Sequence, residues 1–171
     1  MKGLTTIALI GLVLLLAVTP AFPSQETDPE ALIIGARAVV LNPDFSRDAI
    51  TKALADVLGA SLLILPKTDY AAEFRSRIEW VRGSLKNGDL FSDKARQYLG
   101  LAYKLVAGGS LWQVPAELKA ADSAKKGIER ATEICGQLLD SALTERKAGN
   151  NEKAVRYLLE FVLLVVTPIE A

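Results

Sequence analysis

The chain contains no histidine and only one cysteine, and both shortages restrict its chemistry. Histidine is the commonest general base and a very common metal ligand in proteins. A single cysteine cannot form an internal disulfide or a Cys-x-x-Cys metal site, so stability must come from packing. Glycine-rich phosphate loops are also missing. We therefore expect no catalytic residues, no metal site and no cofactor.

An excess of charge of one sign is lacking as well, because 20 basic residues balance 20 acidic ones. This balance gives no electrostatic reason to expect nucleic-acid binding. Half of the 171 residues are hydrophobic and 23% are charged, which favours a packed core over disorder. The length suits a single domain.

The N-terminus has the layout of a secretory signal peptide. Lys2 precedes an apolar run at residues 4–18, and a small-residue cleavage site follows at Ala21. The alternative is an uncleaved anchor, but the run is shorter than the ~20 residues that a membrane-spanning helix needs. We predict a signal peptide at 1–21, no stable membrane anchor after cleavage, and a periplasmic or secreted bacterial protein.

The rest of the chain has the three- and four-residue spacing of amphipathic helices and no strand-like alternation. A short lead-in at 22–28 precedes a single domain at 29–171. Asp28, Ser92, and either Thr68 or Asp69 are expected to cap helices, and a further helix is expected to start near Ser46. Short gaps favour antiparallel neighbours. We predict an all-α antiparallel bundle of about six helices in three hairpins, at 29–41, 46–65, 69–86, 93–107, 115–149 and 152–166.

The longest expected helix, 115–149, has a narrow seam of small and apolar residues and is predicted to be the spine of the bundle. Gly127 and Gly136 are expected to mark a bend or a tight helix crossing. The seam residues of this helix are Leu118, Ala121, Ala124, Ile128, Ala131, Cys135, Leu138 and Ala142.

The helix at 29–41 is apolar on almost every side and is expected to be deeply buried.

Two turns carry a family resemblance. The segment 84–90, followed by Lys94 and Leu99, resembles the hairpin turn of FIMAH-like helical modules on secreted bacterial proteins, and so does 149–154. The resemblance covers residues 76–165 and rests on turn glycines and core positions. It implies an extracellular accessory or interaction domain and no catalytic residues. The related segments 93–99 and 152–158 also suggest a duplicated hairpin.

Few side chains suggest chemistry. Cys135 lies on the apolar seam and is expected to be an inert buried residue. Ser123 and Lys126 match a Ser-x-x-Lys pattern, but its companion motifs are missing and Ser123 is expected on the solvent side of a helix.

The loop at 110–114 is a candidate for partner binding. Leu111 and Trp112 lie in this loop, and loop tryptophans are frequent recognition residues. Trp80 is a third candidate, because it lies one position off a buried stripe. The alternative for each tryptophan is that its ring folds back onto the bundle.

Arg37 and Glu160 are charges within the two most apolar helices, and an unpaired buried charge is costly. One hypothesis is a buried ion pair between Arg37 and Glu160. The alternative is that each charge reaches solvent or pairs locally, as Arg156 could with Glu160.

Together these features predict an exported, non-enzymatic interaction or accessory module that binds an unknown protein partner or self-associates. The alternative is a carrier of a small apolar ligand in the bundle core. An enclosed apolar cavity would favour the carrier.

Overall fold

The computed structural model describes residues 28–44, 46–65, 67–87, 92–119 and 123–168. The predicted signal peptide, residues 22–27 of the lead-in and residues 88–90 of the first resembling turn lie outside these ranges. All regular structure in the described residues is helical, which confirms the all-α prediction. No described helix is both long enough and apolar enough to cross a membrane. The helices are α1 (Pro29–Val40), α2 (Arg47–Ile64), α3 (Ala71–Lys86), α4 (Asp93–Val106), α5 (Ala116–Lys119), α6 (Ala124–Lys147) and α7 (Asn151–Val166).

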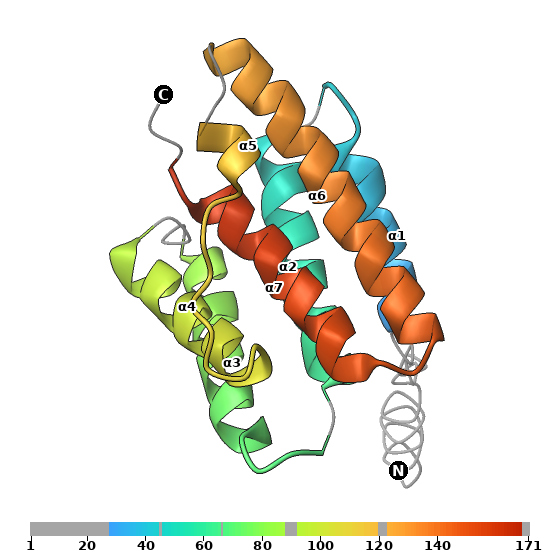
Figure 1. Cartoon of the computed structure of the whole chain (residues 1–171), viewed down its shortest axis with the longest axis vertical. Coiled ribbons are helices and arrows are strands. Elements are labelled where there is room, and N and C mark those ends of the chain that lie inside the picture. Colours follow the sequence, from blue (N-terminus) through green and yellow to red (C-terminus); the bar gives the residue numbers. More distant parts are fainter. Residues whose placement is uncertain (1–27, 45, 66, 88–91, 120–122, 169–171) are drawn as a thin grey trace, which may run out of the picture.

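Six of these helices form two layers of three (Figure 1). One layer has the order α1, α2, α3 and the other has the order α6, α7, α4, and each helix packs on the one opposite. The middle helices, α2 and α7, therefore contact each other and two neighbours in their own layers. Their side chains supply much of the core, including Leu54, Leu58, Leu158 and Phe161, which have no exposed surface.

The helix starts follow the sequence closely in three cases. Asp28 and Ser92 each accept a hydrogen bond from a backbone N–H of the first turn, as predicted, and Ser46 does the same at the predicted start of α2. The prediction for α3 is wrong, because Tyr70 occupies the capping position and makes no side-chain cap. There the backbone forms a turn in which the N–H of Ala71 donates to the carbonyl of Thr68 at 3.1 Å.

The predicted continuous helix at 115–149 is wrong. α5 ends at Lys119 and α6 begins at Ala124, so the described residues form seven helices and not six. Ser123 has extended backbone angles, and its hydroxyl accepts a hydrogen bond from the N–H of Lys126 at 3.4 Å. A serine that bonds locally to the backbone competes with helix continuation. Ser123 is thus a helix cap and does not lie on a helix surface.

The spine prediction is also wrong, because α2 and α7 occupy the centre and α6 lies at an edge. Cys135 and Ala142 are buried as expected, but Ile128 is 68% exposed near the start of α6. α1 lies at the other edge position, which leaves Ile34 56% exposed instead of deeply buried. The expected tight crossing is present at Gly136, where an added Cβ would lie 3.2 Å from the Leu41 side chain.

Candidate functional site

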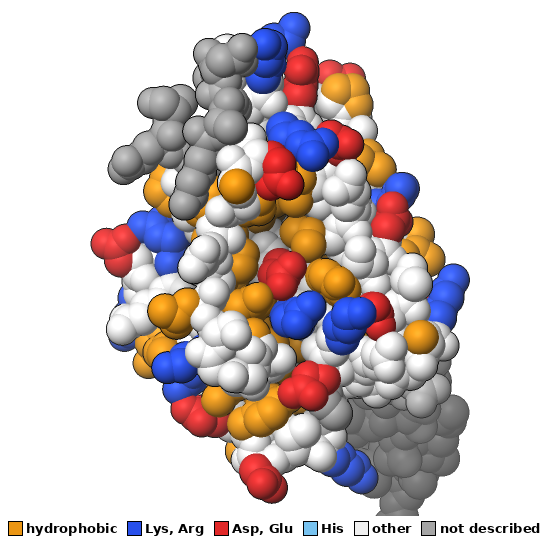
Figure 2. Space-filling model, viewed as in Figure 1, with side chains coloured by type: hydrophobic (Ala, Val, Ile, Leu, Met, Phe, Trp, Pro, Cys, Tyr) orange, Lys and Arg blue, Asp and Glu red, His pale blue; other side chains and the backbone are white. Residues whose placement is uncertain are grey.

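A surface pocket of about 320 Å³ lies where three helices meet the segment that joins α4 to α5. We call it the Trp112 cleft. Figure 2 shows the face of the molecule on which α6, α7 and this segment lie, with hydrophobic and charged side chains interleaved. The lining residues are Leu111, Trp112, Gln113 and Pro115 from the segment, Tyr103 from α4, Ile134 and Leu138 from α6, and Glu160 and Leu164 from α7.

The segment reaches the cleft because the chain reverses after α4. Gly108 and Gly109 have φ angles of +59° and +90°, which side chains other than glycine rarely adopt. The N–H of Gly109 donates to the carbonyl of Lys104 at 2.9 Å and closes the turn. The chain then runs back along the molecule to α5, where Leu118 is buried (Figure 1). Leu111 and Trp112 are therefore held between two fixed ends.

The polar part of the cleft is centred on Glu160. The hydroxyl of Tyr103 donates a hydrogen bond to Oε1 of Glu160 at 3.0 Å. Nε of Arg156, one turn earlier on α7, lies 3.5 Å from the same oxygen. Burial and the negative charge of Glu160 raise the pKa of Tyr103 to about 12. Tyr103 therefore remains a hydrogen-bond donor at neutral pH, and the Glu160 carboxylate stays oriented.

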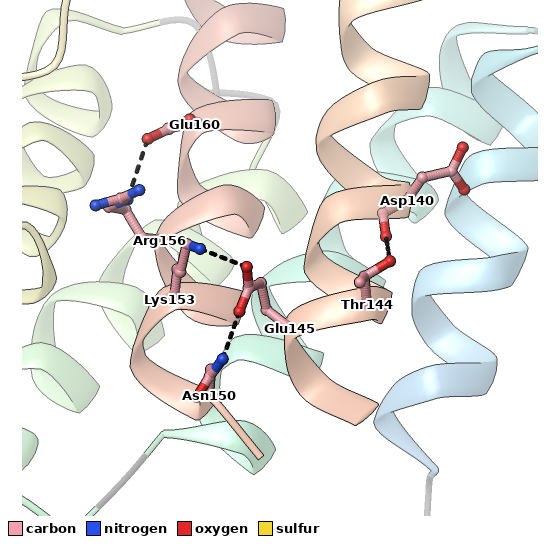
Figure 3. Close-up of polar contacts among 7 residues, drawn as sticks. All are labelled: Asp140, Thr144, Glu145, Asn150, Lys153, Arg156 and Glu160. Carbon is pink, nitrogen blue, oxygen red and sulfur yellow. Dashed lines mark hydrogen bonds and ion pairs between the residues drawn. The ribbon is translucent and has the colours of Figure 1, made fainter. Parts of the chain in front are cut away.

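A second polar group closes the turn between α6 and α7 (Figure 3). Glu145 accepts hydrogen bonds from Lys153 and from the side-chain amide of Asn150. The bond from Lys153 is the main reason why the pKa of the Glu145 carboxyl is lowered. Figure 3 shows Lys153 directed to Glu145 and Arg156 directed to Glu160, one turn further along α7. The turn cluster is satisfied internally, so we assign it to holding the hairpin.

Three of the residues singled out from the sequence meet in the Trp112 cleft, namely Leu111, Trp112 and Glu160. Trp80 does not line this cleft. Its ring stacks on Tyr98 with the centroids 4.6 Å apart, and Lys94 lies over the Trp80 ring. This stack joins α3 to α4.

The expected buried pair of Arg37 with Glu160 is wrong. Nη2 of Arg37 donates to Asp140 at 2.9 Å, and both side chains are substantially exposed. α1 packs against α6, which carries Asp140, whereas Glu160 lies on α7 next to Tyr103 of α4. The alternative, a local pair of Arg156 with Glu160, is the one that forms.

Sequence reasoning missed Tyr103 as a member of the site. Ala95, Leu99, Ala102 and Val106 of its helix recur every three or four residues and are all buried. Tyr103 lies four residues after Leu99 on the same stripe and is 8% exposed. A tyrosine at a buried position needs a partner for its hydroxyl. This requirement could have marked Tyr103 as a candidate from the sequence. Its hydrogen-bond partner, Glu160, could not be named because it depends on the position of α7.

Two other features, a groove between α2 and α3 and the Cys135 thiol, are weaker candidates for a functional site. The groove between α2 and α3 is lined by Asp48, Lys52, Glu79 and Arg82 among others, so its charges are mixed. Cys135 is 4% exposed, and burial raises the pKa of its thiol to about 12. Such a thiol is a poor nucleophile near neutral pH. Among the residues that the structure describes, no three acidic or cysteine side chains are grouped to hold a metal ion.

Comparison of the chain with protein-family models, with curated proteins and with solved structures finds no match. The resemblance of residues 76–165 to FIMAH-like modules therefore stays a prediction. The suggested duplication also stays a prediction, and Tyr98 and Tyr157 have different neighbours: Tyr98 stacks on Trp80, while Tyr157 contacts Arg156.

Proposed function

We propose that the protein is a non-enzymatic interaction module whose partner binds at the Trp112 cleft. The observation that carries this proposal is the composition of the cleft. Leu111 is 71% exposed at its edge, Trp112 is half-buried in its wall, and Glu160 is fixed at its polar end. An aromatic anchor beside an oriented charge, within an apolar surround, is typical of residues that dominate binding energy at protein interfaces.

The arrangement of the core supports this proposal over a carrier of a small apolar ligand. The Trp112 cleft is open to solvent and lies at the edge of the layers. Between the layers, large side chains such as Phe74, Ile78 and Phe161 have no exposed surface and pack into one cluster. Close-packed side chains leave little room for a ligand.

We further propose that the six larger helices form an antiparallel bundle that is exported to the bacterial periplasm or beyond. The apolar run at 4–18 and the small residues that end at Ala21 support cleavage of residues 1–21. The test is mass spectrometry of the protein from the periplasm and from the medium. A mature N-terminus near Phe22 is expected, and an intact Met1 in the cytoplasmic fraction alone would contradict export.

Photo-crosslinking tests the interaction proposal. A photoreactive amino acid replaces Leu111 in the cleft or, as the control, Leu63, which is 56% exposed on α2. We expect a discrete cross-linked product in cells from position 111 and not from position 63, and loss of that product in Trp112→Ala. A product of twice the protein's mass would identify a second copy as the partner. Equal yields at both positions, or no product at position 111, would contradict the proposal.

A further inference from the structure

We propose that the Trp112 cleft binds an organic cation on an aliphatic stem, namely the side chain of a lysine or arginine on the partner. This inference rests on the proposed function and names the chemistry that the cleft would recognise. It follows from the unused hydrogen-bonding capacity of Glu160, from the absence of any other charge among the described lining residues, and from the aromatic and aliphatic walls.

The Glu160 carboxylate is only partly used by the protein. Tyr103 and Arg156 both approach Oε1, and no residue in the described part of the chain donates a hydrogen bond to Oε2. Nε of Arg156 lies 3.5 Å from Oε1 and makes no hydrogen bond, so this contact is an ion pair only. A carboxylate has about four lone-pair sites. Glu160 therefore has room for a further donor, with its position already fixed by Tyr103.

The charge of the cleft favours a cation. Glu160 is the one charged residue among the nine described residues that line it. Arg156 lines a different pocket, at the turn between α6 and α7, and approaches Glu160 from that side. A ligand against the described lining residues therefore meets one carboxylate and no basic lining residue, while Arg156 lies 3.5 Å from Oε1 of that carboxylate. Charge complementarity of this kind gives specificity.

The walls suit the remainder of such a side chain. Leu138 and Leu164 offer aliphatic surface for methylene groups, and long basic side chains commonly bury their stems in this way. The Trp112 ring adds a face that attracts cations when they lie within about 6 Å of its centre. The volume of about 320 Å³ is near the lower limit for ligand pockets, which suits one side chain.

Nuclear magnetic resonance titration of the purified protein tests the inference with three probes of equal length: hexylammonium, hexanol and hexanoate. The indole N–H signal of Trp112 reports binding. We expect hexylammonium to bind about tenfold more tightly than hexanol, as a charge-assisted hydrogen bond would give, and hexanoate to bind least. The preference should weaken as salt is added, because salt screens the attraction.

Glu160→Gln is the decisive variant, because glutamine keeps an acceptor for Tyr103 but loses the charge. It should reduce hexylammonium binding to the level of hexanol. Glu79→Gln is the matched control, since Glu79 also has an arginine four residues earlier, with Arg75 at 3.7 Å, but lies on α3. It should leave the preference unchanged.

The inference is overturned if hexylammonium and hexanol bind equally, if no probe shifts the Trp112 signal, or if the preference survives Glu160→Gln. These outcomes are separate from the cross-linking result. A cross-link at position 111 without a preference for the cation would leave the interaction proposal standing alone. The reverse result would make the cleft a site for a small cation and would contradict the interaction proposal.

Discussion

α6 and α7 pack against each other, yet they contribute differently to the fold. α6 has 24 residues, and its buried side chains include Cys135, Leu139 and Ala142. α7 has 16 residues, and buried positions are spread through it from Ala154 to Val166. The difference follows from position, because α7 is enclosed by α2, α4 and α6, whereas α6 lies at an edge.

Helix length therefore does not indicate which helix lies at the centre of the domain. The long stretch at 115–149 suggested a spine, but its apolar seam is narrow and its other faces are charged. Apolar residues on nearly every side favour burial of a helix but do not secure it, because α1 also has this character and leaves Ile34 56% exposed. The run at 161–166 in α7 has this character, and it predicts the central position better than length does.

Matched leucine truncations test the comparison most strongly. Leu158 of α7 and Leu139 of α6 are both fully buried. We expect Leu158→Ala to lower the free energy of unfolding by about 4–5 kcal/mol and Leu139→Ala by about 2–3 kcal/mol, because an edge site collapses more easily around a cavity. Urea denaturation measures both values. Equal losses would show that α6 is packed as tightly as α7.

The Cys135 thiol tests whether the narrow seam of α6 excludes water. Its pKa is raised from 9.0 to about 12 by burial. The unfolded thiol ionises first, so the unfolded state binds fewer protons between these pH values and the free energy of unfolding falls as the pH rises above 9. Tyr70 and Tyr103, with pKa values raised to about 12, add to this fall only above pH 10.

We therefore expect stability to decline as the pH rises from 9 to 10 in the native sequence, and much less in Cys135→Ala. Urea denaturation at several pH values measures the slope. Ellman's reagent should react slowly with the folded protein at pH 8 and rapidly in denaturant. A fast reaction of the folded protein, or the same dependence of the unfolding free energy on pH in both proteins, would show that water reaches the Cys135 thiol.

Gly136→Ala tests the tightness of the crossing between α1 and α6. Alanine favours a helix interior by up to about 1 kcal/mol over glycine. The new methyl group would lie 3.2 Å from Leu41, whose side chain is 42% exposed at the end of α1 and can move aside. We expect a gain of about 0.5 kcal/mol in chemical denaturation. A loss of stability would show that α1 is held rigidly on α6.

Ile128→Ser should have the smallest effect. Ile128 is 68% exposed near the start of α6, so we expect the free energy of unfolding to change by less than about 0.5 kcal/mol. Thermal denaturation is sufficient to check this. A loss approaching that of Leu139→Ala would show that the first turns of α6 are covered in solution, which self-association could explain.

Local patterns predicted the helices well and their surroundings less well. The caps at Asp28, Ser46 and Ser92 and the buried stripe of α4 were readable, because each depends on residues within one or two turns. The break before Ala124 was missed, since the seam spacing continues across it and only the capping role of Ser123 marks it. Of the site, Leu111, Trp112 and Glu160 were named, but nothing in the sequence linked the first two to the third.

The amino-acid sequence was enough to predict the helical class of the described residues, the start of most helices, and the exclusion of histidine chemistry and of an internal disulfide. These properties follow from composition and from contacts between near neighbours. The packing of the helices was needed to establish that α2 and α7 lie at the centre, that Arg37 pairs with Asp140, and that Trp112 and Glu160 line the same cleft. Such pairings join residues tens of positions apart, and they depend on how whole helices pack.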